Sequence, residues 1–410
     1  MRSVLALLAI IGPLFADGIP KDEYWARRVE LAKSLDGVMV LFGANESDDL
    51  HTGFFQETNF LYLTGWREPG AILLLTPKEE ILFLPPRNLI SERYTGRKLG
   101  AEDDNAIAVT GFAKVLPTYA LQANLQRVLE SSRRIYLAPD DIRATKLKPL
   151  ALFHEEESAI TPIAKLRMIK SPAEIQILTA AADATVAAHL AAWSKIKAGL
   201  YEYQIAAAMT DVYFERGCER SAYAPIVGSG PNSTILHYSS NHRRLDSGEL
   251  VLMDVGAECS DYASDVTRTV PVSGKFTPRQ REIYEVVLGA QKAAIAAARP
   301  GAKLHGAGSL QEIAYQYIDS HGHDLHGESL GRYFTHGLSH HVGLDVHDSS
   351  DMNAPLEAGM VITIEPGIYI PEENIGIRIE DTILVTAEGA KNLSGSLPRE
   401  PKEIERLVGK

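Results

Sequence analysis

The sequence predicts an α/β N-terminal domain followed by a larger α+β domain. Its 410 residues suffice for two or three domains of about 150 residues each. Short apolar runs alternate with turn residues in the first part of the chain, whereas the rest combines long helical patterns with strand-like runs. The 45% hydrophobic and 23% charged residues are typical of globular proteins. With 41 basic against 53 acidic residues, the net charge of −12 argues against a nucleic-acid partner.

The N-terminus has the pattern of a secretory signal. Arg2 precedes an apolar run over residues 4–16, which is shorter than the ~20 residues of a membrane span. We therefore expect a signal peptide over residues 1–16 and export to the periplasm or medium, although Leu14 fits the −3 position poorly. The alternatives are an uncleaved anchor or a buried helix in a cytoplasmic protein. No other stretch is expected to span a bilayer.

The N-terminal domain is expected over residues 18–160. Apolar runs separated by Gly, Pro, Asp and Asn predict strands of one sheet. A helical pattern follows, and then one more strand-like run. The predicted strands are residues 37–42, 60–63, 71–75, 81–84 and 134–137, and the predicted helix is residues 119–131.

The second domain is expected over residues 165–405 and begins with a strong helix signal. Ser171-Pro-Ala-Glu174 has the form of a capping box with proline at the first helical position. Apolar residues then recur at three- and four-residue steps until the predicted end of the helix at Gly199. His189 lies on this apolar stripe, so we interpret it as a core histidine rather than a metal ligand.

The remainder of this domain alternates helices and strands in a way typical of an α+β fold. A glycine-rich turn is expected at residues 228–232. The predicted helices are residues 202–216, 279–298 and 309–320, and the late strands are residues 360–370 and 375–385.

Four carboxylates lie within strand-like apolar runs of this second domain. Asp254 and Asp265 are 11 residues apart in two runs joined by a polar turn, so a hairpin would let them face each other. Glu365 and Glu380 each lie among β-branched residues. Any one of these acids could be a buried salt-bridge partner or a strand-edge charge. Four of them beside the histidine-rich stretch 336–348 favour a site for two divalent cations.

The runs that contain these residues resemble the metal-site segments of the pita-bread metallopeptidases. Among these, the chain is most similar to aminopeptidase P and its relative prolidase. The likeness extends from about residue 165 to 405, and a weaker one covers residues 22–86. The resembling segments are Asp254-Val-Gly-Ala-Glu, Tyr262-Ala-Ser-Asp-Val-Thr-Arg-Thr, His336-Gly-Leu-Ser-His340, Gly343-Leu-Asp-Val-His-Asp348, Glu365-Pro-Gly-Ile-Tyr and Arg378-Ile-Glu-Asp.

The resemblance implies a role for each matching residue. It implies a pita-bread catalytic domain that holds two divalent metal ions, usually manganese, which activate water and polarise the scissile carbonyl. Glu365 would also take the proton from water. The implied metal ligands are Asp254, Asp265, His340, Glu365 and Glu380. The implied cleft histidines are His237, His336 and His347, and Arg378 with Tyr369 would orient Asp254.

The resemblance further implies a metal-dependent exopeptidase, an Xaa-Pro aminopeptidase, that acts on peptides with proline in the second position. The alternatives are an Xaa-Pro dipeptidase and a non-catalytic peptide-binding module. A homodimer or homotetramer fits the family, but Leu61 stands where some members place an aromatic residue that reaches a neighbouring subunit. We expect Cys218 and Cys259 to be free thiols, and His321, His323 and His326 to lie in a solvated loop.

Overall fold

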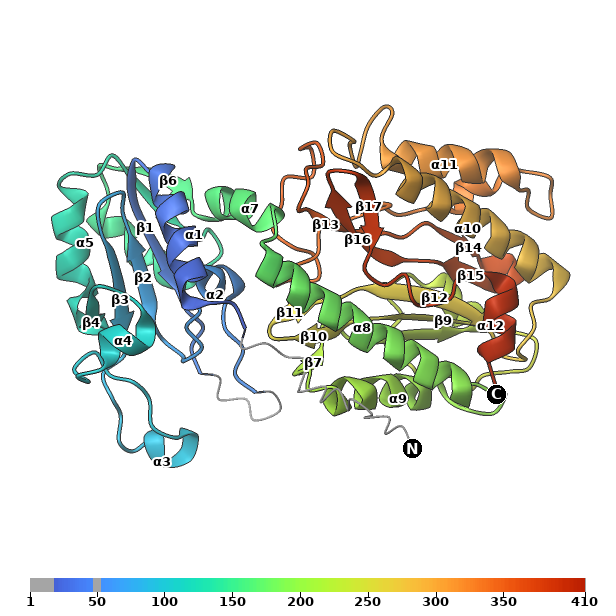
Figure 1. The fold of residues 1–410 in the computed structure, drawn as a ribbon, viewed down its shortest axis with the longest axis horizontal. Coiled ribbons are helices and arrows are strands. Elements are labelled where there is room, and N and C mark those ends of the chain that lie inside the picture. The colour runs from blue at the N-terminus through green and yellow to red at the C-terminus, as the bar shows by residue number, and fades with distance from the viewer. Residues whose placement is uncertain (1–17, 47–52, 410) are drawn as a thin grey trace, which may run out of the picture.

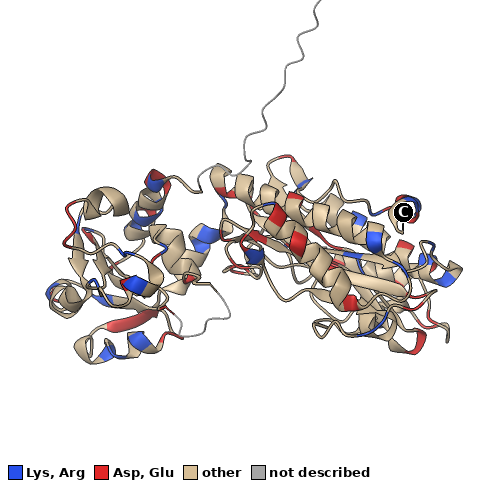
Figure 2. Ribbon diagram, turned by 90° about the horizontal axis from the view of Figure 1, so that it is seen from below, with Lys and Arg blue, Asp and Glu red and all other residues tan. Residues whose placement is uncertain are grey.

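The computed structural model of the chain describes residues 18–46 and 53–409, arranged in two lobes (Figure 1). The predicted signal peptide, residues 1–16, lies outside the described residues. Helix α7 (Ile160–Met168) runs between the two lobes. Lysines and arginines are interspersed with aspartates and glutamates over both lobes (Figure 2).

The N-terminal lobe is built on one mixed sheet of six strands in the order β4-β3-β2-β1-β5-β6. Strand β1 pairs antiparallel with β2 and parallel with β5, so it lies at the centre of the sheet. Side chains that alternate along the strands pack on α5 from one face and on α1 and α2 from the other. The strands are β1 (Gly37–Phe42), β2 (Ile72–Leu75), β3 (Glu80–Leu84), β4 (Val115–Pro117), β5 (Arg134–Leu137) and β6 (Glu155–Ser158).

The helices of this lobe include one that the sequence analysis assigned to a strand. Residues 60–63, predicted as extended, belong to helix α2 (Thr58–Thr64). Glu57 caps the helix by accepting a hydrogen bond from the Phe60 amide, and Gly65 ends it in the left-handed conformation. The apolar run lies in a helix that is buried on all sides, so it has no period that would distinguish it from a strand. The other helices are α1 (Lys21–Lys33), α3 (Glu92–Thr95), α4 (Ala106–Thr110), α5 (Leu121–Leu129) and α6 (Ile142–Thr145).

The second lobe begins with helix α8 (Pro172–Lys195), which crosses the strands beneath it (Figure 1). Its predicted capping box is present: the Ser171 hydroxyl accepts from the Glu174 amide, and the Glu174 carboxylate accepts from the Ser171 amide. His189 is fully buried and bonds through Nε2 to the Val266 carbonyl at 3.0 Å. The interpretation as a core histidine is therefore confirmed.

Helix α8 is also long and apolar enough to cross a membrane, with a mean hydropathy of 1.3. The expectation that no stretch outside the N-terminal run is long and apolar enough to span a bilayer is therefore wrong. Half of its most apolar window is buried inside the structure. That burial, against α9 and strands β10 to β12, accounts for the apolar composition. The other helices of the lobe are α9 (Glu202–Glu215), α10 (Pro278–Ala297), α11 (Leu310–His321) and α12 (Pro401–Leu407).

Small antiparallel sheets form the interior of the second lobe. The orders are β12-β9-β8, β11-β10-β7, β13-β16-β17 and β14-β15. The predicted hairpin is present, with Val266 opposite Val255. The strands are β7 (Arg220–Ser221), β8 (Ile226–Ser229), β9 (Leu250–Val255), β10 (Ala257–Cys259), β11 (Tyr262–Ala263), β12 (Val266–Pro271), β13 (Val361–Ile364), β14 (Gly367–Ile370), β15 (Ile375–Arg378), β16 (Asp381–Thr386) and β17 (Gly389–Asn392).

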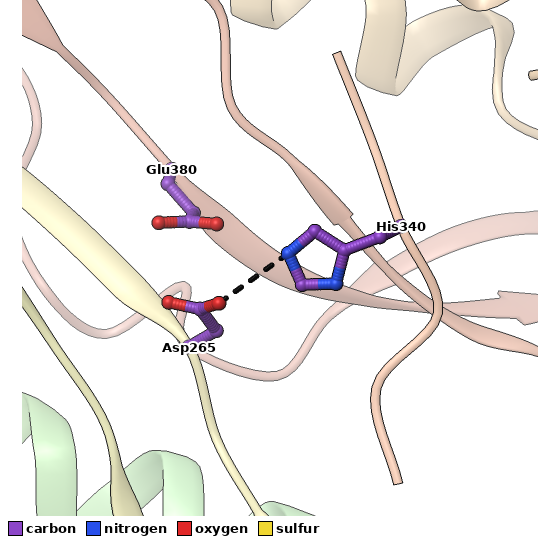
Figure 3. Close-up of side chains that lie close together, drawn as sticks. All are labelled: Asp265, His340 and Glu380. Carbon is purple, nitrogen blue, oxygen red and sulfur yellow. Dashed lines mark ion pairs between the residues drawn. The ribbon is translucent and has the colours of Figure 1, made fainter. Parts of the chain in front are cut away.

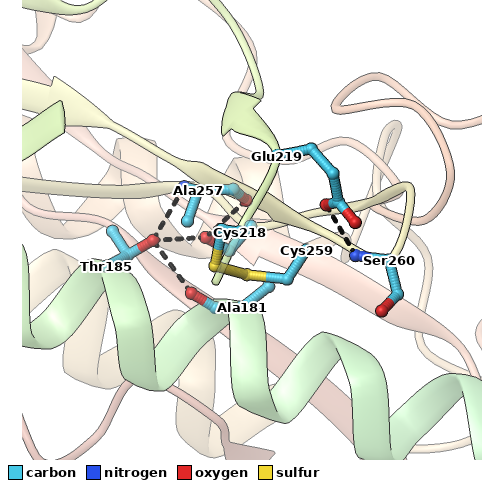
Figure 4. The surroundings of a disulfide bond; sticks show 8 residues. Ala181, Thr185, Cys218, Glu219, Ala257, Cys259 and Ser260 are labelled. Atoms are coloured by element: carbon cyan, nitrogen blue, oxygen red, sulfur yellow. Dashed lines mark hydrogen bonds between the residues drawn. A yellow bond between two sulfur atoms is a disulfide. The ribbon is translucent and has the colours of Figure 1, made fainter. Parts of the chain in front are cut away.

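Cys218 and Cys259 form a disulfide, so the expectation of two free thiols is wrong (Figure 4). Their Cα atoms are 4.2 Å apart although 41 positions separate them in sequence. Cys218 lies just before β7, and Cys259 ends β10, which pairs antiparallel with β7. This pairing of two very short strands brings the sulfur atoms together, and no sequence pattern indicates it.

Candidate metal centre and catalytic pocket

Two of the four predicted acids lie on the β9–β12 hairpin. Asp254 is near the end of β9, and Asp265 immediately precedes β12. The hydroxyl of Tyr223 is 2.5 Å from a carboxylate oxygen of each. Arg378 donates to the other oxygen of Asp254 at 2.5 Å. The hairpin therefore brings both aspartates together, as their spacing predicted.

The two glutamates lie where predicted strands are interrupted. Glu365 follows β13 and is separated from β14 by Pro366, and Glu380 lies between β15 and β16. Thr267 on β12 donates to Glu380 at 2.6 Å, and Thr363 on β13 donates to Glu365 at 3.1 Å. The breaks release both glutamates from the regular sheets while neighbouring threonines hold their carboxylates in place.

His340 completes the cluster from a loop. Its Nδ1 donates to the His341 carbonyl at 3.1 Å, which leaves Nε2 as the free ligand atom. That Nε2 atom is 3.4 Å from both Asp265 and Glu365. Donor atoms of Asp265, His340 and Glu380 all lie within 4.8 Å of one another (Figure 3). His341 is almost fully buried and is absent from the residues that line the cavity, in agreement with the choice of His340.

The electrostatics of this cluster fit a cation site. Burial raises the pKa of Asp265, Glu365 and Glu380 well above the usual range, and repulsion from a neighbouring carboxylate raises it further in each case. The four acids face one buried guanidinium, that of Arg378. Carboxylate oxygens with one imidazole are donors that suit hard and borderline divalent cations. Bound cations would offset the negative charge that burial disfavours.

The cluster lines a cavity of about 690 Å³. His237, His336 and His347 line it together with all five predicted metal ligands and Arg378. Apolar side chains of Ile226, Leu236 and Val346 form part of its wall. The predicted residues thus converge on one pocket whose lining combines acidic, polar and apolar side chains.

Tyr369 is next to this cavity and links two of its lining residues. Its hydroxyl lies 2.8 Å from His336 Nε2 and accepts from Arg378 at 2.7 Å. Because Arg378 also donates to Asp254, the chain of contacts runs from His336 to the hairpin. Burial, followed by repulsion from Arg378, lowers the pKa of His336 to about 4. His336 is therefore neutral at pH 7 in this environment.

Tyr223 and His305 are pocket residues with titratable side chains that the sequence analysis missed. Tyr223 precedes the hairpin by about thirty positions and lies outside the resembling segments. His305 also lines the cavity and belongs to no predicted motif. Neither gives a periodic or spacing signal. His321, His323 and His326 are exposed and absent from the cavity wall, but only His323 and His326 lie in a loop, because helix α11 extends to His321.

Two family models match the chain in succession. Residues 24–136 match the N-terminal domain of aminopeptidase P, and residues 176–387 match metallopeptidase family M24. The chain belongs to metallopeptidase family M24. The second match contains all five predicted metal ligands and the three cleft histidines.

Similar proteins match over nearly the whole chain. The Xaa-Pro aminopeptidase of Haemophilus influenzae is 36% identical, with 95% of this chain and 98% of that protein covered. The Escherichia coli Xaa-Pro aminopeptidase is 35% identical with the same coverage. The solved structure of E. coli aminopeptidase P with the inhibitor Pro-Leu superposes with a TM-score of 0.86 at 31% identity, covering 95% of this chain and 98% of that one. The chain therefore has the two-part aminopeptidase P fold, with the pita-bread domain second.

Proposed function

We propose that this protein is an Xaa-Pro aminopeptidase, which hydrolyses the bond between an N-terminal residue and a following proline. The observation that carries the proposal is the convergence of four acids and His340 on one cavity, in a chain whose relatives, matched over nearly their full length, are Xaa-Pro aminopeptidases. It is thus a metal-dependent exopeptidase of family M24.

We propose that Asp254, Asp265, His340, Glu365 and Glu380 hold two divalent ions, with manganese as the physiological metal. Four carboxylates balance the charge of two dications, and a mostly oxygen donor set suits manganese. When bound, the ions supply Lewis-acid activation of water and of the scissile carbonyl. The contact of Arg378 with Asp254 and that of Thr267 with Glu380 hold the ligand carboxylates in fixed orientations.

Other side chains of the pocket, together with Glu365, contact the substrate and transfer protons. Glu365 accepts the proton of the attacking water on a carboxylate oxygen, since it lines the cavity beside the other proposed metal ligands. His237 and His347, which line the cavity, donate to the carbonyl oxygen as negative charge develops on it. Neutral His336 is held by the Tyr369 hydroxyl and can relay a proton.

Metal removal and one ligand variant test the site. EDTA should abolish hydrolysis of an Xaa-Pro peptide, and manganese should restore it. Asp265→Ala should be inactive and bind less manganese, because it removes an acid at the centre of the cluster. Asp183→Ala, on the exposed face of α8, is the matched control and should retain activity and metal. Full activity of Asp265→Ala would refute the site, and an active protein without metal would refute the metal proposal.

Peptide length separates the proposed activity from that of an Xaa-Pro dipeptidase. The manganese-loaded protein should release glycine from both Gly-Pro-Ala and longer peptides that begin with Gly-Pro. A strict dipeptidase would cleave Gly-Pro alone. A protein that binds these peptides but cleaves none would instead be the peptide-binding module considered above.

We also propose that the chain is exported. The apolar N-terminal run with Arg2 in front of it supports this proposal, as does the Cys218–Cys259 disulfide, since such bonds persist in oxidising compartments. Mass spectrometry of the mature protein should show a new N-terminus after Ala16. An intact N-terminus on a cytoplasmic protein would contradict export. A homodimer or homotetramer is our expectation for the assembly, to be measured by light scattering.

A further inference from the structure

We propose that Arg167 is a positioning residue through which the N-terminal lobe holds His347 in place over the metal centre. This inference rests on the proposed function, in which His347 contacts the substrate. The contacts between the two lobes lie outside the cavity, and on this proposal they influence the reaction by holding His347.

The loop that carries His347 is closed on itself. The Asp348 amide donates to the His341 carbonyl at 2.9 Å, so residues 341–348 form a compact loop next to the ligand His340. Within it, the ring of His347 packs against the ring of His340 with their centroids 4.0 Å apart. The position of His347 relative to the metal centre is therefore set by how firmly this loop is held.

Two carboxylates that flank His347 anchor the loop to Arg167 in the last turn of α7 and to Lys170 between α7 and α8. Arg167 makes ion pairs with both Asp345, at 2.7 Å, and Asp348. Lys170 pairs with the other oxygen of Asp348 at 2.9 Å. The side chains of Arg167, Lys170 and Asp348 are each only 1% exposed. Burial by itself would raise the pKa of Asp348, yet Lys170 and Arg167 bring it below its usual range, so the carboxylate stays charged.

The N-terminal lobe supplies the other half of this arrangement from helix α2. Arg167 donates from Nη1 to Asn59 at 2.8 Å and to the Thr58 hydroxyl at 3.2 Å. The Thr58 hydroxyl in turn donates to Asp345 at 2.9 Å. Thr58 thus joins the N-terminal lobe to the His347 loop both directly and through Arg167.

The apolar contacts follow the same path. One buried cluster contains Phe60 and Leu63 of α2 together with Val342 and Leu344 of the His347 loop. A displacement of α2 would therefore be transmitted to the loop by packing as well as by ion pairs. Because catalytic groups are sensitive to displacements of about 1 Å, with losses of ~10²-fold, loosening this junction should reduce turnover.

A mutant cycle separates positioning from general stability. Thr58→Val keeps the shape of the side chain and removes its two polar contacts, and we expect kcat to fall about 3- to 10-fold with unchanged manganese content. His347→Ala should lower kcat on its own. In the His347→Ala background, Thr58→Val should have no further effect, because the residue that it positions is gone. Arg167→Lys loses the paired contacts of the guanidinium and should lower kcat more than Thr58→Val does. It should likewise have no further effect on kcat in the His347→Ala background.

The control is Arg279→Lys, which loses an equivalent two-pronged pair with Glu373 at the start of α10. It should leave kcat unchanged in both backgrounds. If Thr58→Val reduces kcat equally with and without His347, the effect is structural and the inference is overturned. Turnover of the wild type on Gly-Pro-Ala is measured in the same series, so an inactive wild type would point instead to failure of the proposed function.

A readout that does not depend on activity completes the test. In histidine-labelled protein loaded with diamagnetic zinc, the His347 ring signal is the one lost in His347→Ala. It should shift or broaden in Thr58→Val and in Arg167→Lys but stay in place in Arg279→Lys. An unchanged His347 signal in both junction variants would overturn the inference even for a protein without peptidase activity.

Discussion

At the scale of single residues, the Tyr223 hydroxyl makes the least expected contact of the pocket. It lies 2.5 Å from both Asp254 and Asp265, and burial followed by repulsion from these carboxylates raises the pKa of Tyr223 well above its usual value. The neutral phenol has one hydrogen-bonding proton for two carboxylates, and both carboxylates are metal ligands in our proposal. It thereby holds the two carboxylates in fixed positions relative to each other.

Tyr223→Phe should therefore weaken metal binding. The change removes only the hydroxyl, and loss of such a supporting hydrogen bond typically costs 10- to 100-fold in metal affinity or activity. Titration of the metal-free protein with manganese, followed by calorimetry, measures the effect. Tyr333→Phe is the matched control, since the Tyr333 hydroxyl bonds to Asp324 away from the cavity. Equal manganese affinity in the two variants would contradict this role.

The acids themselves could be predicted from sequence, whereas Tyr223 could not. Asp254, Glu365 and Glu380 stand out because a lone carboxylate in an apolar run is energetically unfavourable unless something offsets its charge. A tyrosine in a loop violates no such rule. Its role follows from which strands lie next to it, and only the folded chain shows that.

At the scale of elements, runs that are apolar throughout were the hardest to interpret. The run 360–370 is two strands, because Pro366 cannot donate to a sheet ladder and breaks the run directly after Glu365. The run 60–63 is helical because Glu57 and Gly65 cap it. Helices that begin with a capping box and proline at the first helical position, α8 and α10, start within one residue of the predicted position. Periodicity predicts an element well only where one of its faces is solvated.

The disulfide links the segment just before β7 to the end of β10 and should contribute to the stability of the protein. The Cys218→Ser, Cys259→Ser double variant is expected to unfold with a free energy lower by about 2–4 kcal/mol, because the bond restricts the unfolded chain over a loop of 41 positions. Urea denaturation measures this difference. Adding a reductant should bring the wild type to the stability of the variant and leave the variant unaffected. Equal midpoints under oxidising conditions would show that the bond does not form.

At the scale of the whole molecule, helix α8 joins the layers of the second lobe through His189. Its ring is fully buried and bonds to β12, and burial, followed by repulsion from Arg268, lowers its pKa to about 3. In the unfolded chain a histidine titrates near 6.5. Between about pH 3 and 6.5, His189 therefore stays neutral in the folded protein, whereas it is protonated in the unfolded chain.

The stability of the protein should consequently fall as the pH decreases from about 6.5 toward 3. Over that range the unfolded state binds more protons, and the loss from His189 approaches about 1.4 kcal/mol per pH unit. His189→Gln keeps a donor and cannot titrate, so its unfolding free energy should depend less on pH than that of the wild type. His321→Gln, on the exposed end of α11, should retain the wild-type slope. Parallel slopes for wild type and His189→Gln, from urea denaturation at several pH values, would contradict this assignment.

The sequence by itself determined the two-part organisation and the four acids in apolar runs, because strand and helix periods, caps and buried charges are visible within short windows. The choice of His340 and of the cleft histidines came from the resemblance of the motifs to those of the pita-bread metallopeptidases. The tertiary structure alone decided the pairing of Cys218 with Cys259, the place of Tyr223, and the junction in which Thr58 and Arg167 hold the His347 loop. Each of these depends on contacts between residues about thirty to nearly three hundred positions apart. Such contacts arise from packing, which no local pattern in the sequence records.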